Sequence, residues 1–305
     1  MATPHINENF ADLLDPRFED IYFMNFEEVA DKIAAFYSMP PHNGRADQRY
    51  SQVGDFGDWS QFMGSVNYQS LSQGFDSIAT FLEWCSGFQI ERRLYDDEQY
   101  NIMDDMPAAL GMAGARTRQT HGARILNNAF SNDSFFSVHS EGVALCSTGH
   151  TSATGVSTAS GFDNLTTPAL SATALTAARK QHVRLKSDAG NKIQIVPDEL
   201  WIPVDLYDVA YEIVASMGKV DTAENNRNVH ESAYTVHEWI YLDDANNWFL
   251  ADGGLRKKSA LWIDRIPVEF GMAEDFDTFV GKWRGYMRYA PIWRDWRFIL
   301  GGQVS

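Results

Sequence analysis

The amino-acid sequence predicts an α+β fold, and three patterns support this prediction. Residues 81–130 contain a long stretch in which apolar and small side chains recur at three- and four-residue spacing, as in a helix. A second stripe of this kind runs from Leu206 to Val214. The last third of the chain reads mostly as strands, at residues 233–242, 248–251 and 261–270, with a turn at 243–247.

The composition is that of a folded protein with an acidic surface. The 305 residues are 44% hydrophobic and 22% charged, enough for one elaborate domain or two small ones. With 25 Lys and Arg against 41 Asp and Glu, the net charge is −16, which argues against nucleic-acid binding as the primary task. A container for DNA tolerates this charge, because a strongly basic inner wall would hold its cargo too tightly; a merely solvated acidic surface is an equally good interpretation.

Cysteine content and hydropathy indicate the compartment. Cys85 and Cys146 are too few for a disulfide framework and lack metal-ligand spacing, which fits a reducing compartment. No window approaches the roughly 18 apolar residues that a membrane span needs, and the first residues do not resemble a secretion signal. We therefore expect a protein that is cytoplasmic when made and has no membrane partner.

The first 80 residues divide into two segments. Residues 23–37 have helical spacing, and Pro40, Pro41 and Gly44 follow them. Residues 45–80 are rich in glycine and aromatic residues and predict a long hairpin or loop. Such a segment cannot easily bury its rings on itself, so they find partners either on another subunit or on the core of the same chain.

The middle of the chain contains the predicted long helix. Asp104 and Asp105 precede Pro107, which suits a helix start because an Asp can cap and a proline is tolerated in the first turn. The small residues that follow would let other elements approach closely. Residues 131–190 are rich in Ser, Thr, Ala and Gly and predict an exposed loop before a helix near Pro168. A strand is expected at residues 192–196.

A search for catalytic or metal-binding motifs finds none of sufficient specificity. His230 and His237 each precede a glutamate. A zinc protease also needs a second histidine four residues after the first, and neither histidine is followed by one. The glycine-rich residues 149–161 lack the Lys-Ser/Thr ending of a phosphate loop. Paired carboxylates at glycosidase separation remain open. We predict no catalytic residue, no metal and no cofactor.

Segment order is more informative than any single motif. Residues 87–130 read GFQIERRLYDDEQYNIMDDMPAALGMAGARTRQTHGARILNNAF, and residues 192–216 read KIQIVPDELWIPVDLYDVAYEIVAS. Together with EGVALCSTGHTSATGVSTASGFDNL at 141–165 and the closing GYMRYAPIWRDWRFILGG, they resemble the major capsid proteins of tailed bacteriophages, the Hong Kong-type coat fold, and most of all those of Mu-like phages. The resemblance covers nearly the whole chain from about residue 45.

The resemblance implies both an architecture and a function. The expected parts are an N-terminal arm (1–44), an extended loop (45–80), a peripheral domain with a spine helix (81–135), a mainly axial domain (136–260) and return strands (261–305). Such subunits form hexamers and pentamers that close into an icosahedral shell around double-stranded DNA. The implied partners are further copies of the chain, portal and decoration proteins, and packaged DNA touched without sequence preference.

Two departures from the family pattern are visible. Some members cross-link the shell covalently through an isopeptide bond from a lysine on the extended loop, but this chain has no Lys between Lys32 and Lys180. We therefore expect a shell held without covalent cross-links. Some relatives carry a cleaved scaffolding segment, for which the short arm leaves no room, so a separate scaffolding protein is implied if assembly needs scaffolding.

Interface residues are predicted from the same resemblance, because aromatic and Arg side chains often anchor interfaces. The expected intersubunit contacts are Tyr50, Trp59, Phe62, Arg92, Arg93, Arg284 and Arg288, although each could instead pack within its own subunit. Two other functions compete with a phage coat. An encapsulin-type nanocompartment shares the fold and encloses enzymes, and a carbohydrate-active hydrolase would use the nine Trp and a carboxylate pair.

Overall fold

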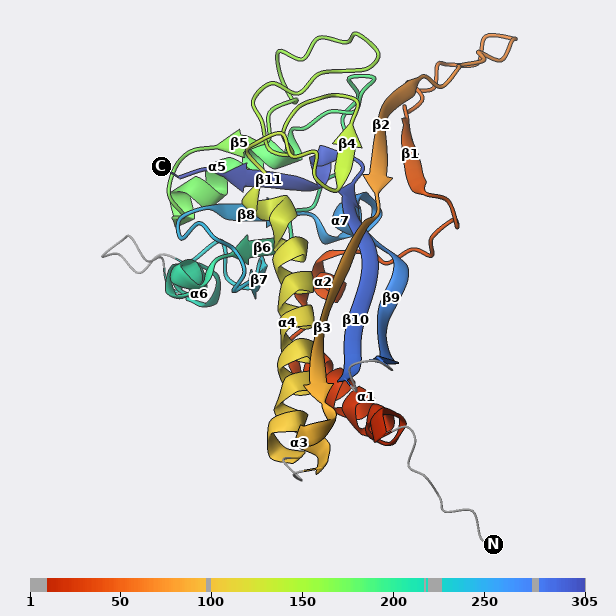
Figure 1. The fold of residues 1–305 in the computed structure, drawn as a ribbon. Coiled ribbons are helices and arrows are strands. Elements are labelled where there is room, and N and C mark those ends of the chain that lie inside the picture. The colour runs from red at the N-terminus through yellow and green to blue at the C-terminus, as the bar shows by residue number, and fades with distance from the viewer. Residues whose placement is uncertain (1–9, 97–99, 217, 219–226, 276–279, 305) are drawn as a thin grey trace, which may run out of the picture. The chain divides into compact units, whose positions relative to one another are not determined.

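The computed structural model describes residues 10–96, 100–216, 218, 227–275 and 280–304. They fall into two compact units, drawn as a ribbon in Figure 1. Unit 1 comprises residues 1–35, 81–122 and 264–289, and unit 2 comprises residues 36–80, 123–263 and 290–305. Helices and strands occur in both units, which confirms the predicted α+β class.

Unit 1 contains a long helix and a three-stranded sheet around a small aromatic core. Its helices are α1 (Phe10–Glu28), α3 (Arg92–Asp96) and α4 (Tyr100–Asn127), and its sheet has the order β3 (Leu82–Glu91), β10 (Val280–Trp293), β9 (Ala260–Asp275). Trp283 is buried, stacked on Phe88 at 5.4 Å between ring centroids and edge-on to Phe18 at 5.1 Å. These rings fix α1 and the sheet together within the unit.

The small residues of α4 allow α1 to approach its backbone. A Cβ on Gly111 would lie 2.4 Å from the carbonyl oxygen of Tyr22, closer than any side-chain carbon can come. One turn further on, a Cβ on Gly114 would meet only side-chain atoms of Tyr22 and Phe26, at 3.2 Å or more. The predicted close approach of another element to the small-residue face is therefore confirmed, with Gly111 at the tightest point.

Unit 2 is built on a mixed five-stranded sheet. Its order is β5 (Leu165–Thr166), β11 (Ile299–Gly302), β8 (Trp248–Ala251), β6 (Glu199–Ile202), β7 (Thr235–Glu238). Helices α5 (Ala172–Val183) and α6 (Tyr207–Ala215) pack on it through a core that includes Leu175, Ile213 and Trp248. Buried Arg256 on α7 (Gly253–Ser259) makes a two-pronged ion pair with Glu199 at 2.6 and 2.8 Å.

A second, three-stranded sheet in unit 2 contains the predicted hairpin. Strands β1 (Asp47–Val53) and β2 (Gln73–Thr80) pair antiparallel, and β4 (Ser137–His139) adds to the other edge of β2. Short elements complete the fold: α2 (Lys32–Phe36), η1 (Val204–Leu206) and η2 (Trp296–Phe298). The hairpin expected within residues 45–80 is confirmed.

Several other expectations are confirmed. Strand β8 has the predicted bounds, and β7 and β9 lie at the predicted strands near 233–242 and 261–270. Helix α6 buries Ala210, Ile213 and Val214 of the predicted stripe. Helix α5 begins after Pro168, where the Ser171 hydroxyl accepts a hydrogen bond from the Ala174 N–H at 3.2 Å and caps it.

Three expectations were wrong, two about the extent of a helix and one about a strand, each for a local reason. The helix expected at residues 23–37 is two helices, because the Asp31 carboxylate accepts the Ile33 N–H at 2.9 Å and starts α2 afresh. Helix α4 begins at Tyr100 rather than after Asp105, and the burial of Met103 in the aromatic core favours the additional turn before Pro107. Residues 192–196 form no strand; the Val196 N–H donates to the Asp252 carboxylate at 2.7 Å instead of to a neighbouring strand.

The approach of α1 to α4 predicts unequal effects of two helix glycines. Gly111→Ala should lower the free energy of unfolding by about 1–3 kcal/mol, because the new methyl meets backbone that must move. Gly114→Ala is the matched control and should change stability by less than about 1 kcal/mol, since a helix gains propensity from alanine. Denaturant unfolding of the purified variants measures both, and equal effects would contradict this account of the packing.

Candidate assembly interface

The root of the β1–β2 hairpin is held by the rest of unit 2. Tyr50 on β1 lies half-buried beneath Arg294, whose guanidinium carbon is 5.2 Å from the ring centre. Asn191 donates to the Asp55 carboxylate at 2.9 Å and to the Phe56 carbonyl at 3.1 Å. Partial burial raises the pKa of Asp55, but hydrogen bonds from Asn191 and Ser187 outweigh it and leave that pKa below its usual value. The carboxylate therefore stays charged and keeps the loop fastened.

The tip of the hairpin, residues 54–72, exposes large apolar side chains to solvent. Trp59 is 96% exposed, Tyr68 90% and Met63 85%. Phe56, Phe62, Val66 and Leu71 are exposed beside them, and several of these residues line a shallow hollow at the tip. The hairpin tip projects beyond the paired strands (Figure 1). Exposed apolar side chains gathered in this way are typical of interaction surfaces.

The predicted contact residues on the hairpin separate into two kinds. Trp59 and Phe62 are exposed at the tip. Tyr50 belongs to the root, where its hydroxyl oxygen accepts from the Gln48 amide at 2.6 Å and its ring lies under Arg294. Its contact with another subunit stays a prediction, as do those of Trp59 and Phe62.

The four predicted arginines lie in unit 1. Arg92 and Arg93 are exposed at the start of α3, and Arg284 is exposed on β10. Arg288 is half-buried: it pairs with Glu83 at 3.5 Å and donates to the Phe81 carbonyl at 3.4 Å. The structure therefore gives Arg288 a partner in its own subunit, while the intersubunit role of all four stays a prediction.

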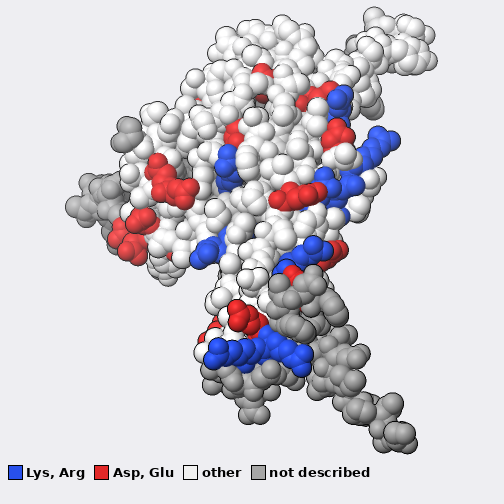
Figure 2. All heavy atoms as spheres, viewed as in Figure 1, with Lys and Arg blue, Asp and Glu red and all other residues white. Residues whose placement is uncertain are grey.

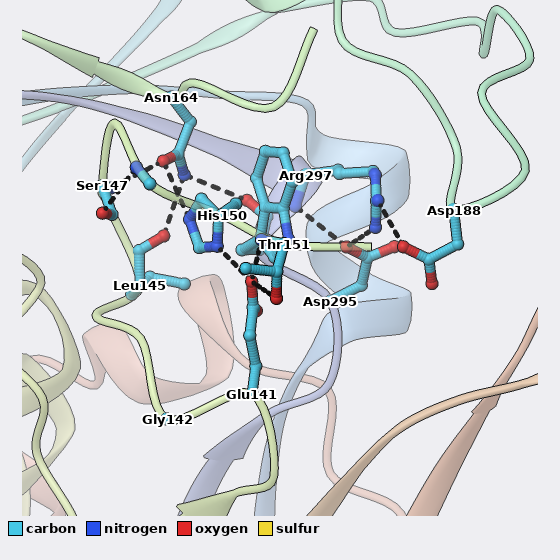
Figure 3. Close-up of polar contacts among 12 residues, drawn as sticks. Glu141, Gly142, Leu145, Ser147, His150, Thr151, Asn164, Asp188, Asp295 and Arg297 are labelled. Atoms are coloured by element: carbon cyan, nitrogen blue, oxygen red, sulfur yellow. Dashed lines mark hydrogen bonds and ion pairs between the residues drawn. The ribbon is translucent and has the colours of Figure 1, made fainter. Parts of the chain in front are cut away.

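A buried polar centre lies beneath the Ser- and Thr-rich loops of unit 2 (Figure 3). Asn164 is fully buried, and its amide donates to the carbonyls of Leu145 at 2.8 Å and Ile299 at 3.0 Å. Those two bonds orient the side chain, so its oxygen accepts from the Ser147 N–H at 2.8 Å and from His150 Nε2 at 3.1 Å. Nε2 of His150 must therefore carry a hydrogen.

The other side of His150 faces an acid. Its Nδ1 lies 3.1 Å from Glu141 Oε1, which also accepts the Thr151 N–H at 2.7 Å, and its ring stacks on Trp296 at 3.9 Å. Both ring nitrogens are thus engaged.

An arginine continues the polar centre next to Trp296 (Figure 3). Arg297 is buried and pairs with Asp188 at 2.8 Å and with Asp295 at 3.0 Å, and its Nε donates to the Lys186 carbonyl at 2.6 Å. Burial lowers the pKa of this guanidinium, but the two carboxylates outweigh it and raise the pKa overall, so it remains charged. The segment around residue 188 is thereby tied to η2.

A second buried histidine is also engaged inside unit 2. His139 lies between the hydroxyls of Ser77 at 2.9 Å and Ser137 at 3.1 Å, and all three are buried. Among the described residues, no group of three or more His, Cys, Asp or Glu is placed to hold a metal ion. None of the helices in the described ranges is long and apolar enough to cross a membrane. The polar centre of unit 2 is thus buried, whereas the aromatic side chains Trp59 and Tyr68 of the hairpin tip face solvent.

Comparison with protein families decides the identity. The model of the family described as phage capsid protein matches residues 83–301, more than two thirds of the sequence. The chain belongs to the phage capsid protein family. This is a family of structural proteins, and membership confirms the resemblance drawn from segment order.

Solved structures agree with this capsid assignment at the level of fold. The chain is similar to the mature capsid of bacteriophage PhiM1, at a TM-score of 0.57 and 11% identity over 90% of this chain and 86% of that one. It is also similar to the bacteriophage JBD30 capsid, at 0.53 and 14% over 80% and 96%, and to a virus-like particle from Pyrococcus furiosus, at 0.51 and 8% over 94% and 98%. None of the curated proteins matches the sequence. The fold of this capsid protein is the Hong Kong-type fold, while a special closeness to Mu-like phages stays a prediction.

Sequence reasoning did not predict all of the exposed residues at the hairpin tip of the capsid protein. Met63 and Tyr68 are about as exposed as Trp59, and Phe56 is more than half exposed, but none of them was among the predicted contacts. The available signal was the absence of alternation between residues 54 and 72, since a hairpin that buried one face would alternate apolar and polar positions.

Two buried histidines predict that the subunit loses stability in acid. Burial lowers the pKa of His139 to about 3 and of His182 to about 4, from an ordinary value of 6.5. The unfolded chain therefore takes up protons first as the pH falls below 6.5, so stability is complete above that pH and declines toward pH 4. Each histidine should cost about 2 kcal/mol at pH 5.

Unfolding measured between pH 7 and pH 5 tests this linkage. His182→Gln should show a loss over that interval that is smaller by about 2 kcal/mol than that of the wild type, whatever its stability at pH 7. His42→Gln, at an exposed position, is the control and should keep the wild-type slope. Parallel slopes for all three proteins would refute the assignment.

Proposed function

We propose that this chain is the major capsid subunit of a tailed bacteriophage and assembles as hexamers and pentamers into an icosahedral head around double-stranded DNA. The observation that carries the proposal is the family match over residues 83–301, together with a fold shared with capsids of two phages. The apolar hairpin tip supports it, because a subunit that stayed monomeric would gain nothing from a tryptophan that is 96% exposed.

The proposal assigns the chain a structural task without catalysis. The subunit is a virion component assembled in the host cytoplasm, and its partners are copies of itself, a separate scaffolding protein, the portal, a decoration protein and DNA contacted without sequence preference. Unit 1, with α4 as spine, corresponds to the peripheral domain, and the α5–α6 part of unit 2 to the axial domain. The segment boundaries at residues 44, 80, 135 and 260 remain part of this proposal.

A competing function is a shell around cargo other than a genome. The similarity to the virus-like particle from Pyrococcus furiosus covers nearly all of both chains, and at 8% identity it establishes a shared fold. The family match to phage capsid protein favours the phage head. The contents of purified shells distinguish the two.

Electron microscopy of the expressed protein, alone and together with genes from the same locus, tests the function. We expect capsomer rings or closed shells, and nuclease-protected DNA inside shells made during infection. After boiling in detergent the shells should run as a single subunit band, because residues 33–179 contain no lysine to form an isopeptide bond from the hairpin. A monomer in every preparation would refute the proposal, and a ladder of covalent oligomers would refute the non-covalent shell.

The hairpin tip should be required for assembly and dispensable for folding. Trp59→Ala combined with Phe62→Ala removes two exposed rings, so the unfolding free energy should change by no more than about 0.5 kcal/mol. Shell yield should fall at least about tenfold, because aromatic anchors dominate interfaces. Ile240→Ala, at a position 73% exposed, is the matched control and should assemble normally. Normal assembly of the double variant would exclude the tip from the interface.

A further inference from the structure

Helix α6 carries an exposed face that the described residues of its own subunit leave uncovered. One side buries Ala210, Ile213 and Val214 in the core of unit 2. On the outer side, Tyr211 is 58% exposed and Tyr207 43%, and their rings stack at 6.0 Å between centroids. Tyrosines one turn apart offer a rigid aromatic surface at small entropic cost, the type of side chain enriched in interfaces.

Three carboxylates surround these tyrosines. Asp205, Asp208 and Glu212 are exposed, and within the described part of the chain none of them is in an ion pair. Asp208 and Glu212 stand one turn apart, a spacing at which like charges destabilise a helix. Figure 2 shows acidic side chains gathered on the left of the view, where Figure 1 draws α6. A partner that brings positive charge would relieve this repulsion.

The complementary surface is the C-terminal end of α5. Arg179, Lys180 and the following Arg184 are exposed, and no ion pair of theirs occurs among the described residues. Val183, 41% exposed, lies among them. These three cations within six residues form a local basic surface in a chain of net charge −16, and the helix dipole accounts for their placement at this end without accounting for the absence of an ion pair among the described residues.

We propose that the α6 face (Asp205, Tyr207, Asp208, Val209, Tyr211 and Glu212) of one subunit docks on the α5 end (Arg179, Lys180, Val183 and Arg184) of a second copy of this chain. The two surfaces differ, so the contact is head-to-tail, the type of contact that generates a ring where the rotation between subunits closes. Both helices pack on the same core of unit 2, which holds each surface rigid. This inference rests on the proposed capsid function and identifies the contact that orders subunits around a ring.

Charge reversal on each surface tests the pairing. Asp208→Lys with Glu212→Lys makes the α6 face basic, and Arg179→Glu with Lys180→Glu makes the α5 end acidic. Each double variant should lower the yield of rings and shells at least about tenfold, because like charges meet across the contact. The quadruple variant, which carries all four substitutions, restores opposite charges and should assemble with a yield within about threefold of that of the wild type.

Mixing the two double variants gives a sharper result. In an alternating ring, each basic α6 face meets an acidic α5 end and each acidic α6 face meets a basic α5 end. Alternation needs an even number of subunits, so the mixture should form six-membered rings and fail to form five-membered ones. Size-exclusion chromatography and negative-stain microscopy, with circular dichroism to verify folding, measure these outcomes.

Controls separate the inference from the proposed function. Glu19→Lys with Asp20→Lys reverses two exposed charges on α1 and should leave assembly unchanged. If a reversal variant fails to fold, the neutral pair Asp208→Asn with Glu212→Asn replaces it and should lose assembly several-fold. Two outcomes would overturn this contact and leave the coat function standing. One is wild-type assembly by either α6 variant. The other is a quadruple variant that assembles no better than the less competent of the two double variants. Failure of the wild type to assemble would instead refute the proposed function.

Discussion

The buried amide of Asn164 is the interaction on which the ordered form of the loop region depends. It joins the backbone at Leu145 and Ser147 to β11 at Ile299, and it presents its oxygen to His150. A segment so rich in serine, threonine and glycine has few apolar side chains with which to pack itself down. A saturated hydrogen-bonding centre replaces that missing apolar core, and any member left unpaired would carry the full cost of its desolvation.

The hairpin shows how one element serves both folding and association. Its root is fastened by Tyr50 beneath Arg294 and by Asn191 on Asp55, all within unit 2. Its tip exposes Trp59, Met63 and Tyr68, which contribute nothing to the stability of the subunit alone. Holding the root in one geometry lowers the entropy lost when the tip binds, so many modest contacts suffice in a closed shell.

Charge is distributed unevenly between the inside and the outside of the subunit. Several arginines are used internally, as in the pairs Arg118–Asp264, Arg256–Glu199 and Arg297–Asp188. Each of these pairs removes one cation and one acid, so the whole excess of 41 acids over 25 cations remains outside them. The few remaining clusters of positive charge, such as that at the end of α5, therefore stand out as places for a negatively charged partner surface.

Much of the fold followed from local patterns in the sequence. The stripe on α6, the strand β8 and the hairpin were predicted because side-chain period and glycine content act over a few residues. Segment order was enough to indicate the capsid family, and the residue sequence itself shows that the hairpin has no lysine. The exposed positions of Trp59 and Phe62 decide against one of the two alternatives that the sequence left open, a loop that buries its rings on the core of its own chain.

What the sequence left undecided depended on contacts between residues far apart in the chain. Helix α4 begins at Tyr100 because Met103 packs with Phe18 and Trp283 in a buried core. The segment before β6 does not pair as a strand because the Val196 N–H donates to the Asp252 carboxylate instead. Whether Tyr50 and Arg288 lie open or engaged was likewise set by Arg294 and Glu83. The sequence by itself determined the class, the family and most elements, because those depend on local periodicity and composition. Only the tertiary structure decided which side chains remain exposed for a partner, because burial depends on neighbours that local patterns do not reveal.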